Sequence, residues 1–144
     1  MKQIIKAPNE EWINYLAQMW LFGNEISQDI LNKEMDGSLG DLQKIQDILD
    51  TKQVDSEATQ VLEALGVIFG KVFVNETPHY DWWIVEDEHG IDACVRYKET
   101  SLISFPQEMI VRRVEDNEEF NVPELYEQLG NELAEIQEKH FQNT

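Results

Sequence analysis

Apolar residues recur every three or four positions through the first half of the chain, which is the spacing that places them on one face of an α-helix. Asn9 precedes the first run and is a candidate N-cap, because the two glutamates behind it suit the positive end of a helix dipole. Two sets of apolar residues then recur at helical spacing. One set is Ile13, Leu16 and Trp20, and the other is Trp12, Tyr15 and Met19. Gly23 and Asn24 predict a break or bend, and a second short helix that ends at Gly37 is expected next. Its apolar positions are Ile26, Ile30, Leu31 and Met35.

Two more helices are predicted before the middle of the chain. Asp41 is expected to cap the first, whose inner face would be Leu42, Ile45, Ile48 and Leu49. Asp55 or Ser56 would begin the second, which runs to about Val74 with an apolar face of Val61, Leu62, Leu65, Ile68, Phe69, Val72 and Phe73. Gly66 and Gly70 lie four positions apart in it, although each glycine costs a helix about 1 kcal/mol. Their spacing predicts close packing against a sheet or another helix.

The pattern then changes to that of strands. Residues 82–86 and 91–97 are rich in β-branched and aromatic side chains, and residues 87–90 between them predict a hairpin turn. Residues 101–105 predict a third short strand. Since no strand–helix–strand pattern occurs here, we expect an antiparallel meander of three strands.

Two helices are predicted after the meander. Pro106 suits the first turn of one, and Asn121 with Glu124 resembles a capping box at the start of the last. The expected inner face of the last helix is Val122, Leu125, Leu129, Leu133 and Ile136. The predicted fold class is therefore α+β: a helical N-terminal part, a three-stranded antiparallel meander and two C-terminal helices. We expect a single domain over residues 1–144, in which residues 1–55 extend a core of residues 56–144.

Charge narrows the range of partners. The 144 residues include 29 acids against 11 bases, a net charge of −18, which disfavours binding to nucleic acid or to an anionic membrane. The only cysteine, Cys94, cannot form an intramolecular disulfide, which fits a reducing compartment. No export signal or membrane-spanning run is evident, so a cytoplasmic location is expected.

The middle and C-terminal segments carry a family resemblance. The relevant stretches are residues 65–70 (LGVIFG), residues 83–92 (WIVEDEHGID), and then Ser104-Phe105-Pro106, Met109-Ile110 and Arg112-Arg113-Val114-Glu115. Over about residues 60–130 the chain resembles the domain of unknown function 3806 (DUF3806) family. The resemblance implies the same order of helix, three-stranded meander and helix. It implies no activity, because the family has no established reaction.

No catalytic or metal-binding motif emerges from the sequence. His79, His89 and His140 are too widely spaced for a short zinc motif, and the acids of the hairpin turn lack the spacing of a calcium loop. Cys94 lies in an alternating strand and is expected to be an inert, buried thiol. Nucleophile, phosphate-loop and dinucleotide motifs are absent. We therefore expect no catalytic residues, no metal and no cofactor.

The distribution of carboxylates is the most informative functional feature. Residues 114–138 contain no Lys or Arg, and four glutamates of the last helix share one stripe opposite its leucines. The predicted partner-binding residues are Glu124, Glu127, Glu135 and Glu138 of that stripe, Glu86, Asp87 and Glu88 of the hairpin, and Trp82 or Trp83 as an aromatic anchor. These residues favour a non-enzymatic acidic protein that binds a basic partner, such as an immunity-type inhibitor of a basic toxin or nuclease. The alternatives are a housekeeping or regulatory accessory domain, acidic only for solubility, and a hydrolase assembled from dispersed residues. The sequence leaves the oligomeric state open.

Overall fold

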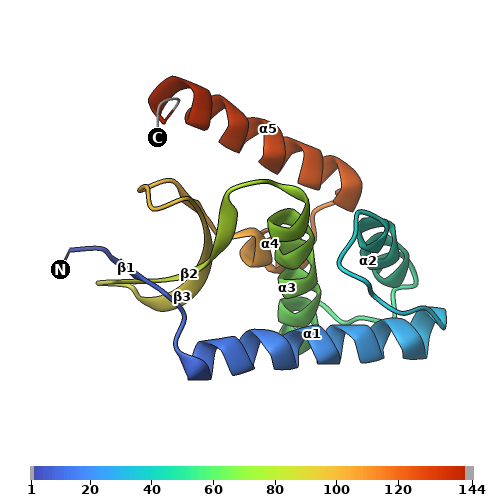
Figure 1. Cartoon of the computed structure of the whole chain (residues 1–144). Helices are drawn as coiled ribbons and strands as arrows, with labels where there is room; N and C mark the ends of the chain where they lie inside the picture. Colours follow the sequence, from blue (N-terminus) through green and yellow to red (C-terminus); the bar gives the residue numbers. More distant parts are fainter. Residues whose placement is uncertain (1, 142–144) are drawn as a thin grey trace.

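Five helices and four strands follow one another along residues 2–141, the part of the chain that the computed structural model describes (Figure 1). In chain order they are β1 (Ile4–Lys6), α1 (Glu10–Leu31), α2 (Gly40–Asp50), α3 (Thr59–Glu76), β2 (Tyr80–Asp87), β3 (Gly90–Tyr97), β4 (Ile103–Ser104), α4 (Pro106–Glu115) and α5 (Val122–His140). Figure 1 shows α3 near the centre, α1 below it, α5 above it and the sheet to one side. The α+β class and the helices at both ends agree with the sequence prediction.

The sheet is antiparallel in the order β1-β2-β3-β4, so the prediction of three strands is wrong by one. The additional strand, β1, pairs with β2 in a register that places Ile5 opposite Val85. Three residues are too few to show an alternating pattern, and this strand depends on a partner far away in the sequence. At the other edge, β4 is shorter than the five residues predicted, and Ser104 lies opposite Val95.

Helix α1 runs without a break through Gly23 and Asn24, contrary to the prediction of two helices. Gly23 instead allows α1 and α3 to approach closely, because a Cβ at this position would overlap the side chain of Ile68 on α3. The helix ends at Asn32, whose left-handed backbone (φ 57°) closes it with a bond from its N–H to the carbonyl of Gln28. Met35, predicted to be helical, lies in the following loop.

Asp41 does not cap α2 but lies inside its first turn, completely buried. Its carboxylate accepts a hydrogen bond of 2.7 Å from the Gly37 N–H and two longer ones from the Asp36 N–H. The Lys44 ammonium lies 3.1 Å from the same carboxylate. Asp41 therefore holds the loop before α2 rather than the helix end, which corrects the sequence prediction.

Helix α3 begins at Thr59, later than predicted, and its two glycines do pack closely, as expected. A Cβ on Gly66 would overlap the backbone of Gln107, so this glycine lets α3 and α4 approach. A Cβ on Gly70 would lie 2.5 Å from the Trp82 ring and 3.2 Å from Pro106. The two glycines thus allow both α4 and the sheet to pack closely against α3.

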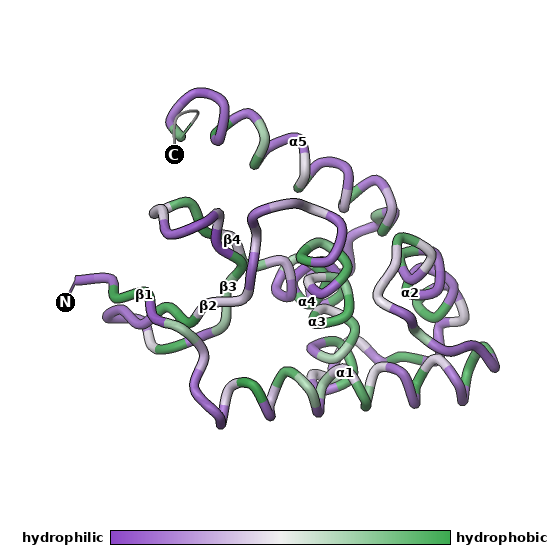
Figure 2. The backbone as a smooth tube through the Cα atoms, viewed as in Figure 1, coloured by the Kyte–Doolittle hydropathy of each residue, from purple (hydrophilic) through white to green (hydrophobic). Residues whose placement is uncertain are grey.

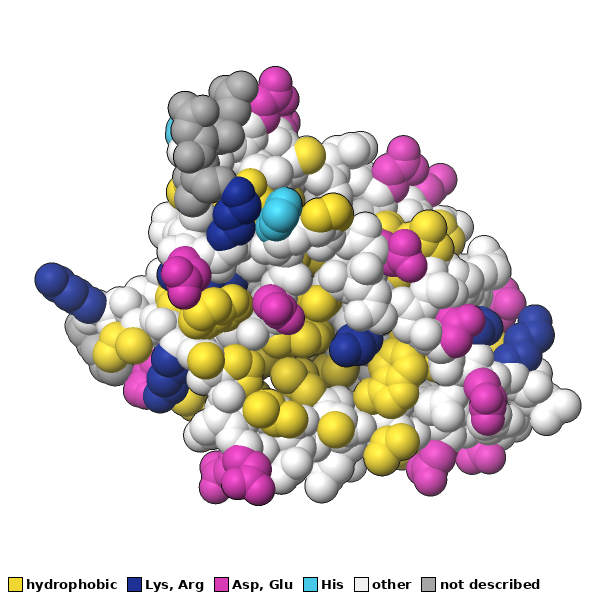
Figure 3. Space-filling view, in the orientation of Figure 1, with side chains coloured by type: hydrophobic (Ala, Val, Ile, Leu, Met, Phe, Trp, Pro, Cys, Tyr) yellow, Lys and Arg dark blue, Asp and Glu magenta, His cyan; other side chains and the backbone are white. Residues whose placement is uncertain are grey.

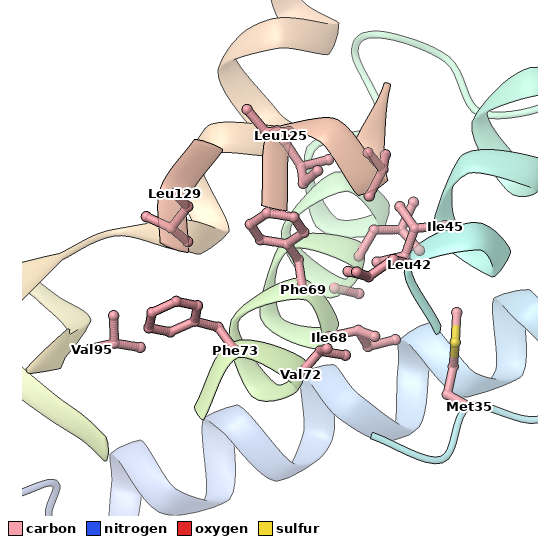
Figure 4. Packing of buried hydrophobic residues seen from close by; sticks show 14 of the residues in the cluster. Met35, Leu42, Ile45, Ile68, Phe69, Val72, Phe73, Val95, Leu125 and Leu129 are labelled. Atoms are coloured by element: carbon pink, nitrogen blue, oxygen red, sulfur yellow. The ribbon is translucent and has the colours of Figure 1, made fainter. Parts of the chain in front are cut away.

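One cluster of buried side chains joins the N-terminal helices to the rest of the chain (Figure 4). Phe69 points from α3 toward Leu125 of α5, whereas Phe73 points toward Val95 of the sheet. Figure 2 shows α3 as almost continuously hydrophobic and α5 as mostly hydrophilic, which fits a central helix and an outer one.

The cap predicted for α5 is present, because the Asn121 side chain accepts a 3.0 Å bond from the Glu124 N–H. The predicted inner position of Ile136 is wrong, since that side chain is 39% exposed. Gln137 faces inward beside it and accepts a hydrogen bond from the Tyr80 hydroxyl, at 3.1 Å.

Candidate functional site

An apolar groove opens between α1, α3 and β2, with a volume of about 730 Å³. Figure 3 shows hydrophobic side chains gathered around a hollow on this face, with both acidic and basic side chains around it. The apolar lining includes Ile13, Leu16, Trp20, Leu21, Val67 and Trp82. Lys71 and Asp81 are the charged residues of the lining. Its size and composition are those of binding sites, which are concave, mostly apolar and furnished with few polar groups.

Helix α1 supplies one wall with a face that its own fold leaves partly uncovered. Residues 13, 16, 17, 20 and 21 follow the spacing of a core-facing helix. Even so, the side chain of Ile13 is 56% exposed and that of Leu21 is 61% exposed. Next to this face, Gly23 lies against Ile68 of α3.

Trp82 and Trp83 both line the groove and both are half-buried. Neighbouring residues of a strand point to opposite faces, and the two indoles have different supports. Trp82 packs against the core and lies on Gly70. Trp83 lies under the guanidinium of Arg96, 4.5 Å from its ring centre. Both rings are thereby held in place by neighbours outside the groove.

The four glutamates of the α5 stripe are all exposed, and the leucines on the opposite face of α5 are buried. Lys139 lies 2.8 Å from Glu135, the one ion pair that this stripe forms within residues 2–141. Glu124, Glu127 and Glu138 have no counter-charge at ion-pair distance in that range. Lys44 and Arg112 pair elsewhere, with Asp41 and Glu108.

The hairpin acids have partners within the hairpin and its neighbour strand. Lys6 of β1 lies 3.8 Å from Glu86, and His89 lies 3.5 Å from Glu88. Asp87 accepts a 2.8 Å hydrogen bond from the His89 N–H, so it shapes the turn. The structure does not bring the predicted set together in one site: Trp82 and Trp83 line the apolar groove, whereas Asp87 lines another cleft together with Glu132 of α5.

A second, polar cleft of about 230 Å³ lies where α1, α3, β3 and α4 meet. In it the Tyr15 hydroxyl donates to Glu63 at 3.2 Å, and Arg112 donates to Glu108 at 3.0 Å. Burial raises the pKa of Tyr15 to about 12, and the negative charge of Glu63 contributes to the increase. Burial also raises the pKa of Glu108. The positive charge of Arg112 lowers this pKa in part, and the nearby Asp92 raises it further. Sequence reasoning missed this cluster because its members come from four separate elements.

Two buried polar groups complete the description of the region around β3. Gln107 is only 9% exposed; its Nε2 donates to the Ala93 carbonyl at 2.6 Å, while its Oε1 has no partner among the described residues. Cys94 is fully buried, and burial raises the pKa of its thiol to about 11. A thiol with that pKa is protonated near neutral pH and is a poor nucleophile.

Neither a metal cluster nor a membrane-crossing helix is found in residues 2–141. In that range no three His, Cys, Asp or Glu side chains are placed to hold a metal ion. Of the helices there, none has the length and apolar character needed to cross a bilayer.

The fold thus defines an α+β protein in which a glycine-bearing helix packs against a hairpin and a following helix. The chain belongs to the DUF3806 family, described as a domain of unknown function, whose model matches residues 41–126. This match begins earlier and ends slightly sooner than the resemblance seen in the sequence. No curated protein matches the chain.

A crystal structure from Bacteroides thetaiotaomicron VPI-5482 is similar in fold, with a TM-score of 0.81 at 17% sequence identity. The similarity covers 90% of this chain and 47% of that one, so this chain spans about half the length of the solved protein. At this identity the likeness shows the fold alone.

Proposed function

We propose that this protein is a non-enzymatic binding protein that captures a basic protein partner. The observation that carries the proposal is the exposed, single-sign stripe of α5, in which three of four glutamates lack a counter-charge within the described residues. Like charges three or four positions apart on a helix repel one another and cost stability. A partner that presents Lys or Arg to this stripe would remove the repulsion.

The charge of the whole chain supports the same proposal. Its net charge of −18 attracts a cationic protein over distances near the Debye length, about 10 Å at 0.1 M salt. Such attraction raises the association rate more than the final affinity. The stripe and the net charge would therefore steer the partner.

The most concrete form of this function is an immunity-type inhibitor of a basic toxin or nuclease. Carboxylates at regular spacing can occupy the cationic surface on which a nuclease binds nucleic-acid phosphates. In this form the protein would act in the cytoplasm, where the nuclease finds its substrate.

Two other functions give different results in the same assays. An accessory domain that is acidic only for solubility would show no selective partner. A hydrolase is favoured by one observation, the raised pKa of Glu108 in the polar cleft, because a general acid needs such a shift. In that case Glu108→Gln would abolish turnover and leave partner binding intact.

The test is capture of partners from the native host at low and high ionic strength, about 0.05 and 0.5 M. We expect a basic protein that is retained at low salt and released at high salt. Changing the four stripe glutamates to glutamine should weaken the complex about tenfold, through losses of a few tenths of a kcal/mol or more at each pair.

A matched control separates the stripe from the general charge. It neutralises four exposed acids elsewhere: Glu25, Asp29, Glu57 and Glu99. Both variants change the net charge by the same amount, so only the stripe variant should bind the partner about tenfold more weakly. Equal losses in the two variants, or a partner held equally at both salt concentrations, would refute the role of the stripe.

A further inference from the structure

We propose that the apolar groove between α1, α3 and β2 is the surface on which the basic partner is anchored, through an amphipathic segment whose apolar side chains fill the groove. This inference rests on the proposed function and adds the contact that holds the complex. Charge alone gives a fast but weak encounter, whereas buried aromatic and aliphatic anchors supply most of the affinity at protein interfaces.

Helix α1 leaves part of an apolar face uncovered beside the groove. Its apolar residues follow the spacing i, i+3, i+4, i+7, i+8, which in a folded domain faces the core. Ile13 and Leu21 at the two ends of this face are nevertheless more than half exposed. Single exposed apolar residues need no explanation, but a row of them beside a hollow lined with tryptophan marks an interaction site.

The groove is already formed in the unbound protein. Trp82 is fixed by its contact with Gly70, and Trp83 by the guanidinium of Arg96, so neither ring must be ordered on binding. Tryptophan held in place in this way is the residue type most often found as a binding hot spot. A preformed groove also lowers the entropy that association costs.

Charge decides which occupant fits. A second copy of the chain carries another −18, and an anionic bilayer is also negative, so both would be repelled. A basic segment is attracted, and acids lie where its flanks would pass: Glu10 and Glu11 in the first turn of α1, and Asp81 in the lining. Lys71 is the one Lys or Arg in the described lining and can meet a carbonyl or carboxylate of the segment.

The length of the α1 wall indicates the form of the segment. Positions 13 to 21 cover just over two helical turns, the length over which a docked helix presents anchors at i, i+3 or i+4, and i+7. The segment is therefore an amphipathic helix with one aliphatic face and one basic face. Helix α5, which carries the glutamate stripe, lies on the other side of α3 from α1 (Figure 1), which separates steering from anchoring.

The experiment uses two synthetic helical peptides as probes: one of leucine and lysine with an amphipathic pattern, and one in which serine replaces every leucine, so that the charge is unchanged. Binding is followed by tryptophan fluorescence, which suits this site because Trp20, Trp82 and Trp83, three of the four tryptophans, line the groove. The groove variant is Ile13→Gln with Leu21→Gln. The matched control is Ile91→Gln with Ile136→Gln, which changes exposed isoleucines (45% and 39%) outside the groove.

We expect the leucine–lysine peptide to bind with a blue shift of the emission, and the groove variant to weaken it about tenfold while the control variant leaves it unchanged. Neutralising the α5 stripe should slow association and leave dissociation unchanged. Because the altered side chains are exposed, both variants should unfold at the same temperature as the parent protein.

Other outcomes overturn the inference in distinguishable ways. If both peptides bind alike, or if the groove variant binds as tightly as the parent, the contact is electrostatic only: the groove proposal fails while the proposed function stands. If neither peptide binds at low salt, the proposed function fails as well. Binding of decanol or decanoate that the peptide cannot displace would identify the groove as a small-molecule site. Concentration-dependent dimerisation lost in the groove variant would identify a second copy as the occupant.

Discussion

The indole of Trp82 packs against Gly70, so closely that a Cβ at that position would lie 2.5 Å from the ring carbon Cη2. This contact links the interior of the protein to its surface, because Trp82 also forms part of the apolar groove. The glycine that a helix should avoid is therefore the reason that a tryptophan of the sheet can pack closely against α3.

Replacing Gly70 by alanine tests that contact. Alanine favours a helix by about 1 kcal/mol, but the added methyl group must displace the indole, and overpacking of this kind costs about 1–3 kcal/mol. We expect a net loss of stability in urea unfolding. Gly130→Ala in α5 is the control, since nothing lies within 4 Å of its added Cβ, and it should gain stability. A gain in both variants would contradict the packing described here.

The buried Asp41 carboxylate makes a second prediction. Asp41→Ala should lower the free energy of unfolding by about 3 kcal/mol, because it leaves the backbone N–H groups of Asp36 and Gly37 and the Lys44 ammonium without their acceptor. Asp41→Asn keeps one acceptor oxygen and should lose less. Asp47→Ala is the control, since among the described residues its half-buried side chain accepts a single hydrogen bond, from Gln43. Chemical denaturation of the three variants measures how much stability each one loses. Equal losses for Asp41→Ala and Asp47→Ala would refute the role of the buried carboxylate.

Cys94 should be unreactive in the folded protein. Its side chain is fully buried, and burial raises the pKa of the thiol to about 11, so little thiolate exists at about pH 8. A chromogenic aromatic disulfide should therefore release no thiolate dye from the native protein and one equivalent in denaturant. Rapid labelling without denaturant would show that the strand opens or that the thiol is accessible.

Stability should depend on pH through Glu108. Its pKa is raised in the folded state, chiefly by burial, so the folded protein holds this proton more tightly than the unfolded chain. The resulting penalty is absent at low pH and grows as the pH rises from the ordinary carboxyl pKa through the raised one. Glu108→Gln removes it, so the stability of the variant relative to the parent should rise between about pH 4 and pH 7. Urea unfolding of both proteins at these two pH values measures the difference in their stability. A difference that stays constant or falls as the pH rises would contradict the prediction.

Local patterns were sufficient for most of the secondary structure. Residues 87–90 signalled the hairpin and Asn121 signalled the start of α5, because each depends on backbone conformation or on neighbours within a few positions. The glycines of α3 signalled close packing, but not that Gln107 and Trp82 would be the residues packed against them. The stripe of α5 was visible for the same reason, since helical spacing alone places its glutamates together.

Whatever depends on partners far apart in the sequence was decided only by the tertiary structure. Gly23 looked like a helix breaker until Ile68 lay against it, and β1 exists because β2 offers it an edge. The groove forms because α1 leaves part of an apolar face uncovered beside Trp82, and the polar cleft collects side chains from four elements. A sequence encodes the periodicity of each element directly, but it encodes which faces meet only through the packing of the whole chain.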